Sequence, residues 1–254
     1  MPERAHKVFQ ILTLNQISPL GLKHFAASRY TVGNHIVEPD AILVRSHNML
    51  QMDVPASVTA IGRAGAGTNN VPVKDMNLRG VPVFNAPGAN ANAVKELVLA
   101  GLLMASRNLI PAIRFTEGLQ GDNATLHKLA EDGKKHFAGI ELPGRTLGII
   151  GLGAVGRLVA DAAIGLGMKV MGYDPEITVD AAWSLSAQVK KAESIEDLLH
   201  HSDFITLHVP LLDATRGLIN HELVQSMKKG AILLTFSRDG IIDETAVLTG
   251  LESG

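Results

Sequence analysis

The 254-residue sequence is long enough to form one or two globular domains with buried cores. Its 46% hydrophobic and 19% charged residues exclude a disordered chain and a coiled coil. The formal net charge of −2 excludes binding to nucleic acid through a bulk positive field, and the absence of cysteine excludes disulfides, thiolate zinc sites and a cysteine nucleophile.

The sequence shows no targeting or membrane segment. Its first seven residues include the charged Glu3, Arg4 and Lys7 and lack the apolar stretch of a signal peptide. The longest apolar stretch, 97–105, is about half as long as a bilayer span requires. We therefore expect a cytoplasmic protein with no membrane partner and no nucleic-acid partner.

The first part of the chain alternates short apolar runs with helix-like patterns, which predicts β-α-β units around a parallel sheet. This part is expected to be a substrate-binding domain, residues 1–104. Its predicted strands are 8–14, 41–44, 59–61 and 81–84, and its predicted helices lie near 20–27 and 73–78.

A helix predicted over 91–109 is apolar almost all the way round. Such a helix is typically buried between two domains or in a subunit interface. Pro111 and the polar stretch 120–123 then interrupt the pattern. We place the domain change near residue 105, which leaves residues 105–254 as a second and larger domain.

The second domain repeats the alternation and contains a glycine-rich turn. Its predicted strands are 146–150, 169–173, 204–209 and 231–236, each followed by a helix-like pattern. Directly after the first of these strands comes the pattern G-x-G-x-x-G, formed by Gly151, Gly153 and Gly156. At a strand-to-helix turn this spacing is typical of a pyrophosphate site, with Ala154 and Val155 opening the helix whose free amides face the anion. The alternative is an ordinary glycine loop.

Asp174 ends the next predicted strand, 23 residues after Gly151. A carboxylate at this place accepts hydrogen bonds from the adenosine ribose and repels a 2′-phosphate. It therefore predicts NAD rather than NADP. The alternative is a solvated acid in an Asp-Pro turn.

Several motifs in this order make the sequence resemble the D-isomer-specific 2-hydroxyacid dehydrogenases over essentially its whole length, and most of all the branch that acts on D-3-phosphoglycerate. They are Arg45-Ser46, the runs 61–70 and 83–96, 148–156, 172–175, 208–211 with 215–217, and 227–231 leading to Arg238.

The resemblance implies two flavodoxin- or Rossmann-like parallel-sheet domains flanking a cleft, the second of them incomplete at its C-terminus. It also implies a homodimer or homotetramer that uses NAD to oxidise the 2-hydroxyl of D-3-phosphoglycerate, the first step toward serine. The cofactor-binding residues that it implies are Gly151, Gly153, Ala154, Val155, Gly156, Asp174, His208, Val209, Pro210, Phe236, Ser237 and Arg238.

Arg238 follows a predicted strand at the carboxyl edge of its sheet, where open α/β sheets bind ligands. A guanidinium there can grip a carboxylate and polarise the carbonyl that accepts hydride. The resemblance gives it this catalytic role, and the alternative is a surface ion pair with Asp239 or Asp243.

The rest of the substrate site also follows from the resemblance. Arg45 and Arg63 correspond to arginines suited to a phosphate or a second anionic group, the alternative being structural ion pairs. The backbone of Gly65, Ala66 and Gly67 would cradle the substrate carboxylate, and the small anionic 2-hydroxy or 2-oxo acid is the expected partner.

Three positions depart from the family pattern. Ala66 stands where relatives carry threonine, Val209 where they often carry threonine, and Ser237 lies in a segment that in relatives reads Asn-Cys-Ala-Arg or Asn-Thr-Ala-Arg. These changes affect side-chain contacts and leave backbone contacts possible.

The family's catalytic histidine and glutamate would follow Gly254 by motif, so we expect this span to bind NADH and to turn substrate over negligibly. His208 is the nearest internal candidate for proton transfer, against a packed or backbone-bonded histidine. No metal-ligand spacing stands out. Two other readings remain: a dehydrogenase for another D-2-hydroxy acid, and an NAD-sensing scaffold that resembles the corepressors built on this fold.

Overall fold

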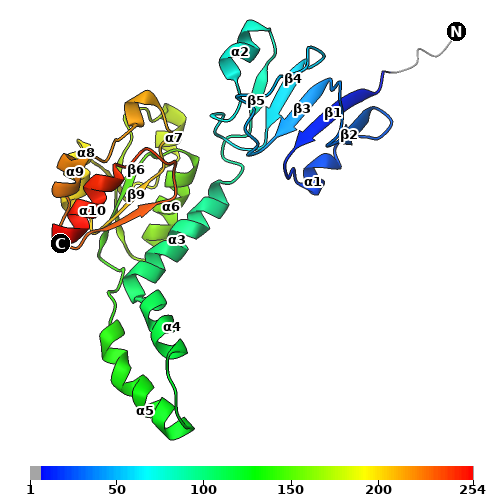
Figure 1. Ribbon diagram of the computed structural model, residues 1–254. Coiled ribbons are helices and arrows are strands. Elements are labelled where there is room, and N and C mark those ends of the chain that lie inside the picture. The colour runs from blue at the N-terminus through cyan, green and yellow to red at the C-terminus, as the bar shows by residue number, and fades with distance from the viewer. Residues whose placement is uncertain (1–6, 254) are drawn as a thin grey trace, which may run out of the picture. The chain divides into compact units, whose positions relative to one another are not determined.

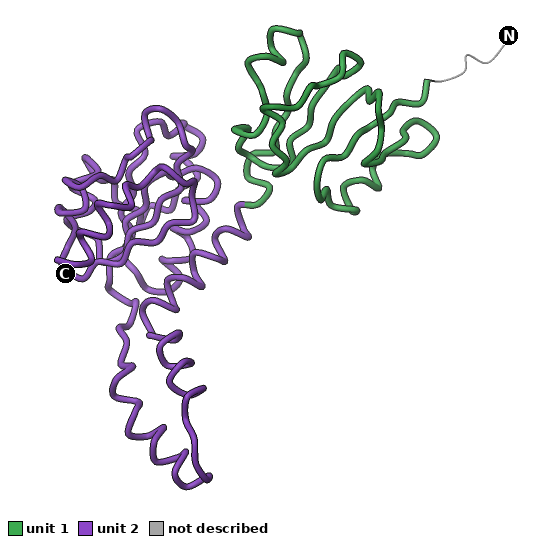
Figure 2. Tube along the Cα trace, viewed as in Figure 1, with its two compact units in different colours: residues 1–90 green, residues 91–254 purple. Residues whose placement is uncertain are grey.

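Two five-stranded parallel β-sheets form the cores of two compact units, which confirms the expected α/β class. The computed structural model describes residues 7–253. Unit 1 ends at Asn90 and unit 2 begins at Ala91 (Figure 2). This division comes earlier than the boundary expected at residue 104, because helix α3 (Ala91–Arg107) packs on α6 (Ala154–Gly165) and β10 (Ile232–Thr235) of unit 2.

The sheet of unit 1, sheet A, has the strand order β2-β1-β3-β4-β5. The order reverses between β1 and β3, and the carboxyl ends of strands at such a switch point are where open α/β sheets bind ligands. The central strands fully bury one apolar face, at Ile42, Val44 and Ile61, and Ala41 and Leu43 on the other face are half-buried. The elements of unit 1 are β1 (Phe9–Leu14), α1 (Pro19–Leu22), β2 (Tyr30–Gly33), β3 (Ala41–Val44), β4 (Ala60–Arg63), α2 (Val73–Leu78) and β5 (Val83–Asn85).

The sheet of unit 2, sheet B, has the order β10-β9-β6-β7-β8. Counted in chain order from β6, this is the 3-2-1-4-5 arrangement of dinucleotide-binding sheets, with its switch point between β6 and β9. Its first strands are β6 (Thr146–Ile150), β7 (Lys169–Tyr173), β8 (Val189–Lys191) and β9 (Phe204–Leu207). The remaining helices of the sheet are α7 (Val179–Trp183), α8 (Ile195–His201), α9 (His221–Gln225) and α10 (Glu244–Ser253), with a short 3-10 turn at Asp213–Thr215.

Two further helices, α4 (Leu109–Glu117) and α5 (Asn123–Gly133), run beside each other from the end of α3 (Figure 1). The ring of Phe115 in α4 lies 5.2 Å from that of Phe137 in the 3-10 helix Lys134–Phe137 that follows α5. Apolar side chains on α3 and α4 remain exposed, at Leu97, Leu103, Met104, Ile110 and Ile113. Within the part of the chain that the structure describes, α3 is buried on one face, with Val98 and Leu102 in the core of unit 2.

No single helix within residues 7–253 has the length and apolar character to cross a membrane. The helices α3 and α4 meet those criteria only as a pair, and they are bent by 66° where they meet.

Candidate functional site

The glycine-rich turn follows β6 at the carboxyl edge of sheet B (Figure 1). Gly151 has φ +91°, a conformation that favours glycine, and a Cβ there would lie 2.8 Å from the carbonyl oxygen of His208. A Cβ on Gly156 would lie 2.0 Å from the carbonyl oxygen of Gly151. The first and third glycines are therefore required by the fold of the turn itself.

Gly153 differs from both, because the fold does not require it to be glycine. Its φ of −68° suits any residue, and a Cβ there would meet nothing within 4 Å. Gly153 is the N-cap of α6 and provides no side-chain cap. The backbone N–H groups of Ala154 and Val155, at the start of the helix, therefore have no hydrogen-bond acceptor within the helix. The turn thus leaves open space in front of free N–H groups at the positive end of a helix, which suits an anion.

Asp174 lies at the end of β7 and holds the glycine turn in place. Its Oδ2 accepts a hydrogen bond from the amide of Leu152 at 2.8 Å, and its Oδ1 accepts one from the amide of Glu176 at 3.0 Å. Each carboxylate oxygen has a second lone pair. Asp174 can therefore accept hydrogen bonds from a ligand hydroxyl while it keeps both backbone contacts.

The end of β9 packs against the glycine turn at the switch point. The amide of His208 donates to the carbonyl of Ile150 at 2.7 Å, and the His208 Nε2 lies 3.1 Å from Oγ1 of the buried Thr206. Burial lowers the pKa of His208 from 6.5 to about 4. The imidazole is therefore neutral at pH 7. Val209 packs on Gly151 and Pro210 is exposed beside it.

The loop after β10 carries the residues expected to meet the substrate end of the cofactor. Phe236 turns toward α3, where its ring would contact a Cβ on Gly101 at 2.9 Å, so only its backbone is available at the sheet edge. The hydroxyl oxygen of Ser237 lies 3.3 Å from that of Thr235. Arg238 is exposed and forms no ion pair with Asp239, Asp243 or any other residue from 7 to 253.

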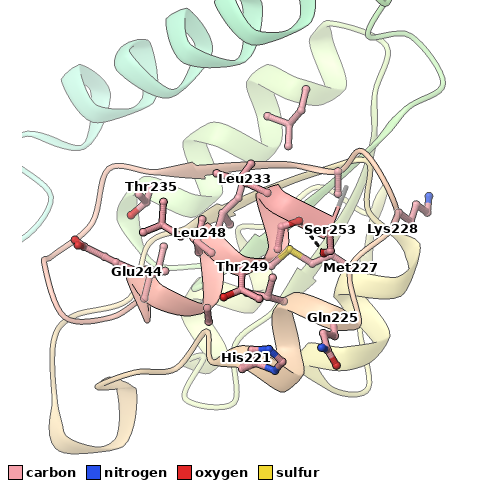
Figure 3. Close-up of a pocket in the computed structure, with 18 of the residues that line it drawn as sticks. His221, Gln225, Met227, Lys228, Leu233, Thr235, Glu244, Leu248, Thr249 and Ser253 are labelled. Atoms are coloured by element: carbon pink, nitrogen blue, oxygen red, sulfur yellow. Dashed lines mark hydrogen bonds between the residues drawn. The ribbon is translucent and has the colours of Figure 1, made fainter.

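A cavity of about 1350 Å³ lies along the outer edge of β10 in unit 2. Figure 3 shows Leu233 and Thr235 of β10 facing Leu248 and Thr249 of α10, with His221 and Gln225 of α9 at its border. None of the glycine turn, Asp174 or His208 lines it. It shares Ser237 and Arg238 with the predicted site, whereas the residues proposed for the pyrophosphate and the ribose lie outside it.

In unit 1, Arg45 lies directly after β3 at the switch point of sheet A. It lines a recess of about 460 Å³ together with Thr13, Asn15 and Ser18 from the segment that ends β1 and follows it. Asn15 has φ +63°. The exposed Arg45 forms no ion pair with any of the residues that the structure describes.

Arg63 is placed differently from Arg45. It ends β4, and a Cβ on Gly65, where φ is +147°, would lie 1.9 Å from its Nη1. The guanidinium therefore packs on the loop Gly65–Gly67. Ala66 is exposed, and its carbonyl accepts a hydrogen bond from Asn85 Nδ2 at 2.7 Å.

The structure thus gathers the predicted residues at two sheet edges, one in each unit. Sequence reasoning missed Asn70 and Asn85, whose side chains hold the loops of sheet A in place. It also missed the pairing of Thr206 with His208, for which two polar residues at alternate positions at a strand end were the available signal. Within residues 7–253, no group of three or more His, Asp or Glu side chains could hold a metal ion.

Comparison with known proteins places the sequence in a family. Residues 99–254 match the model described as D-isomer specific 2-hydroxyacid dehydrogenase, NAD binding domain. The D-3-phosphoglycerate dehydrogenase of Methanocaldococcus jannaschii is 39% identical over 222 residues, which is 86% of this chain and 40% of that protein. The hydroxypyruvate reductase of Thermotoga maritima is 36% identical over 223 residues, 86% of this chain and 67% of that protein.

A solved structure agrees with these sequences. The NAD+-bound 3-phosphoglycerate dehydrogenase of Entamoeba histolytica superposes with a TM-score of 0.74 at 26% identity, over 97% of this chain and 77% of that one. The chain spans only 40% of the length of the D-3-phosphoglycerate dehydrogenase from Methanocaldococcus jannaschii. With the dinucleotide-type sheet and its glycine turn, the match over 99–254 shows that the chain belongs to the D-isomer specific 2-hydroxyacid dehydrogenase family and carries that family's NAD-binding domain.

Proposed function

We propose that the protein is an NAD-dependent dehydrogenase for a D-2-hydroxy acid with a second anionic group, and that D-3-phosphoglycerate is its substrate. The observation that carries the proposal is the open space at Gly153 in front of the free amides of α6, in a position where the protein's own fold does not require glycine. The names of the relatives, D-3-phosphoglycerate dehydrogenase among them, support the choice of acid.

The residues of unit 2 fit the cofactor. The turn Gly151–Gly156 would hold the pyrophosphate and Asp174 the adenosine ribose, while His208, Val209 and Pro210 would border the rest of the site with the backbone of Phe236 and Ser237. When bound, NAD+ supplies the acceptor for the hydride that leaves C2 of the acid. Arg238, which has no ion pair in the described chain, would orient the substrate carboxylate and the developing carbonyl.

In unit 1 the proposed substrate contacts are the backbone of Gly65, Ala66 and Gly67 for the carboxylate, and Arg45 and Arg63 for the second anionic group. Arg45 is the more accessible of these two arginines, since it borders the recess at the switch point. A second copy of the chain is part of the proposal, because α3 and α4 expose a run of apolar side chains suited to a homo-oligomer. The cysteine-free sequence fits a cytoplasmic location.

A second candidate is a dehydrogenase for glycerate, because the Thermotoga maritima relative is named hydroxypyruvate reductase. Glycerate and 3-phosphoglycerate differ only in the phosphate at the far carbon. The same two acids therefore decide between the candidates.

The test is a panel of 3-phosphoglycerate, D-glycerate, D-lactate and L-lactate, titrated calorimetrically into the NADH-loaded protein. We expect 3-phosphoglycerate to bind about tenfold tighter than D-glycerate, since one added charge-assisted contact is worth about 1.4 kcal/mol or more. NADH formation from NAD+ with the same acids should follow the same ranking wherever turnover is measurable. Equal affinity for L-lactate and 3-phosphoglycerate would contradict the proposal.

Asp174 should make the protein prefer NADH over NADPH by about tenfold or more, because its carboxylate repels a 2′-phosphate. Trp183 is the only tryptophan of the sequence and lies in α7, which follows the Asp174 turn, so energy transfer from it to bound cofactor can report binding. Asp174→Asn removes the charge and keeps one acceptor oxygen, which can retain one of the two hydrogen bonds from the amides of Leu152 and Glu176. It should bring the two affinities close together. Tighter NADPH binding by the unchanged protein would show that Asp174 does not face the ribose.

A further inference from the structure

Two asparagine side chains tie together the loops of unit 1 that follow strands β3, β4 and β5. Asn70 Nδ2 donates to the carbonyl oxygen of Arg45 at 3.2 Å and to that of His47 at 2.7 Å. Its backbone carbonyl also accepts a hydrogen bond from the amide of Met49 at 2.8 Å. Because both side-chain contacts are with carbonyl oxygens, only a donor can make them. Asn70 thus holds the Arg45–Met49 segment.

Asn85 plays a similar part on the other side of the glycine-rich loop. Its Nδ2 donates to the carbonyl oxygen of Ala66 at 2.7 Å, and the amide of the next residue, Ala86, donates to the carbonyl oxygen of Gly65 at 3.0 Å. These bonds fix the loop Gly65–Gly67 to the end of β5. Neither of them reaches the Arg45 segment.

The sheet places the two held segments next to each other. In sheet A, Val44 pairs with Arg63 and Arg63 pairs with Asn85, so the ends of β3, β4 and β5 lie side by side. Neighbouring strands are about 4.8 Å apart. The segment after β3 and the loop after β4 can therefore engage two groups that a short carbon chain separates.

The side-chain amide of Asn70 is held in place although one of its polar atoms is buried without a partner, which indicates that its hydrogen bonds to the Arg45 segment are functionally important. Asn70 Oδ1 is buried and has no hydrogen-bond partner among the residues that the structure describes. A buried, unsatisfied acceptor is unfavourable. The position nevertheless holds an amide, which offers the two N–H donors that the carbonyls of Arg45 and His47 use.

On the basis of the proposed function, we propose that Asn70 and Asn85 are positioning residues with separate tasks. Asn70 fixes Arg45 for the second anionic group of the acid, and Asn85 fixes the loop Gly65–Gly67 for its carboxylate. Each acts through the backbone that it holds. Substrates with and without the distal charge should therefore respond differently to the loss of each side chain.

The experiment compares 3-phosphoglycerate with D-glycerate in calorimetric titrations of the NADH-loaded protein. Asn70→Ala should raise the Kd of 3-phosphoglycerate about fivefold and that of D-glycerate less than about twofold. Asn85→Ala should raise both by the same factor, about threefold or more. The matched control is Asn77→Ala, an exposed asparagine of α2 that lies outside both held segments; it should leave both constants unchanged.

Two further variants distinguish positioning from general loosening of the fold. Asn70→Asp keeps the size of the side chain but has no donor, so it should behave like Asn70→Ala; Asn70→Ser keeps one donor and should restore part of the affinity for 3-phosphoglycerate. Equal losses for both acids in Asn70→Ala, or no loss in either asparagine variant, would overturn the assignment.

A readout without substrate is amide hydrogen exchange. Asn70→Ala should speed exchange at Met49 and leave Ala86 unchanged, and Asn85→Ala should do the reverse. Unchanged exchange in both variants overturns the inference even if acids bind. If the protein without substitutions binds NADH but neither 3-phosphoglycerate nor D-glycerate, the proposed substrate is wrong. The separate roles assigned to Asn70 and Asn85 in substrate binding then fail with it. The hydrogen-exchange pattern shows independently whether the two asparagine side chains hold their loops.

Discussion

Gly156→Ala is expected to lower the free energy of unfolding of unit 2 by about 3 kcal/mol and to abolish NADH binding. The added Cβ would lie 2.0 Å from the backbone oxygen of Gly151 and 3.3 Å from Ile149 Cγ2. A backbone oxygen cannot move aside as a flexible side chain can. The first turn of α6 would have to separate from the end of β6, which displaces the amides that face the cofactor.

Two other glycines of the same helix region supply matched controls. Gly165→Ala, at the other end of α6, meets nothing within 4 Å and should be neutral or stabilise by about 0.5–1 kcal/mol. Gly153→Ala also meets nothing within 4 Å, so the free energy of unfolding should stay within about 0.5 kcal/mol. Its methyl group would occupy the space proposed for the pyrophosphate, and NADH affinity should fall about tenfold.

Urea denaturation followed by circular dichroism measures the stability of each variant, and energy transfer from Trp183 measures NADH binding. The three glycines separate the two quantities: stability and binding are lost at Gly156, binding alone at Gly153, and neither at Gly165. If Gly153→Ala bound NADH as well as the unchanged protein, the pyrophosphate would not lie at this turn.

His208 should make the protein less stable as the pH falls from 7 to 5. Its folded-state pKa of about 4 lies below the unfolded value of 6.5. Between these values the unfolded chain binds a proton that the folded protein does not, so the free energy of unfolding rises with pH. The contribution is fully present above pH 6.5 and is about 2 kcal/mol smaller at pH 5.

His208→Gln should remove this part of the pH dependence, because glutamine does not titrate and can still bond to Thr206. The free energies of unfolding at pH 7 and pH 5 give the measurement, with His221→Gln, an exposed histidine of α9, as the control. An NMR titration of the imidazole gives the pKa directly. A His208 that titrates near pH 6.5 in the folded protein would refute the neutral, buried imidazole and would reopen a role in proton transfer at neutral pH.

The sequence was most informative for the short apolar runs that form strands near the middle of each sheet. The runs 41–44, 146–150 and 169–173 are strands with the predicted bounds, since central parallel strands are recognisable as short apolar runs. The glycine turn was predictable for a related reason, because its spacing reflects contacts within one turn. The edge strands β2 and β8 were missed. They are short and only partly apolar, and the three residues of β8 include Lys190 and Lys191.

Two features depend on distant partners and left no local signal. Helix α3 looked apolar on every side, so its pattern did not show that Val98 and Leu102 would join the core of unit 2. The asparagine tethers connect loops across 19 to 25 residues, which no helical or strand period predicts. For the same reason the sequence assigned Arg45 and Arg63 the same role in binding an anionic group. In the structure Arg45 borders a recess, whereas Arg63 packs on the loop Gly65–Gly67.

The position of β6 in sheet B has a kinetic consequence. This strand pairs with β7, which follows it closely, and with β9, and the bond from the Thr146 amide to Asp203 at the start of β9 spans 57 residues. Closing so long a loop is slow, as it is for parallel sheets in general. His208 and Val209 reach the glycine turn only after that pairing forms. The capacity to bind dinucleotide should therefore be among the last properties that the refolding chain recovers, well after most of its secondary structure.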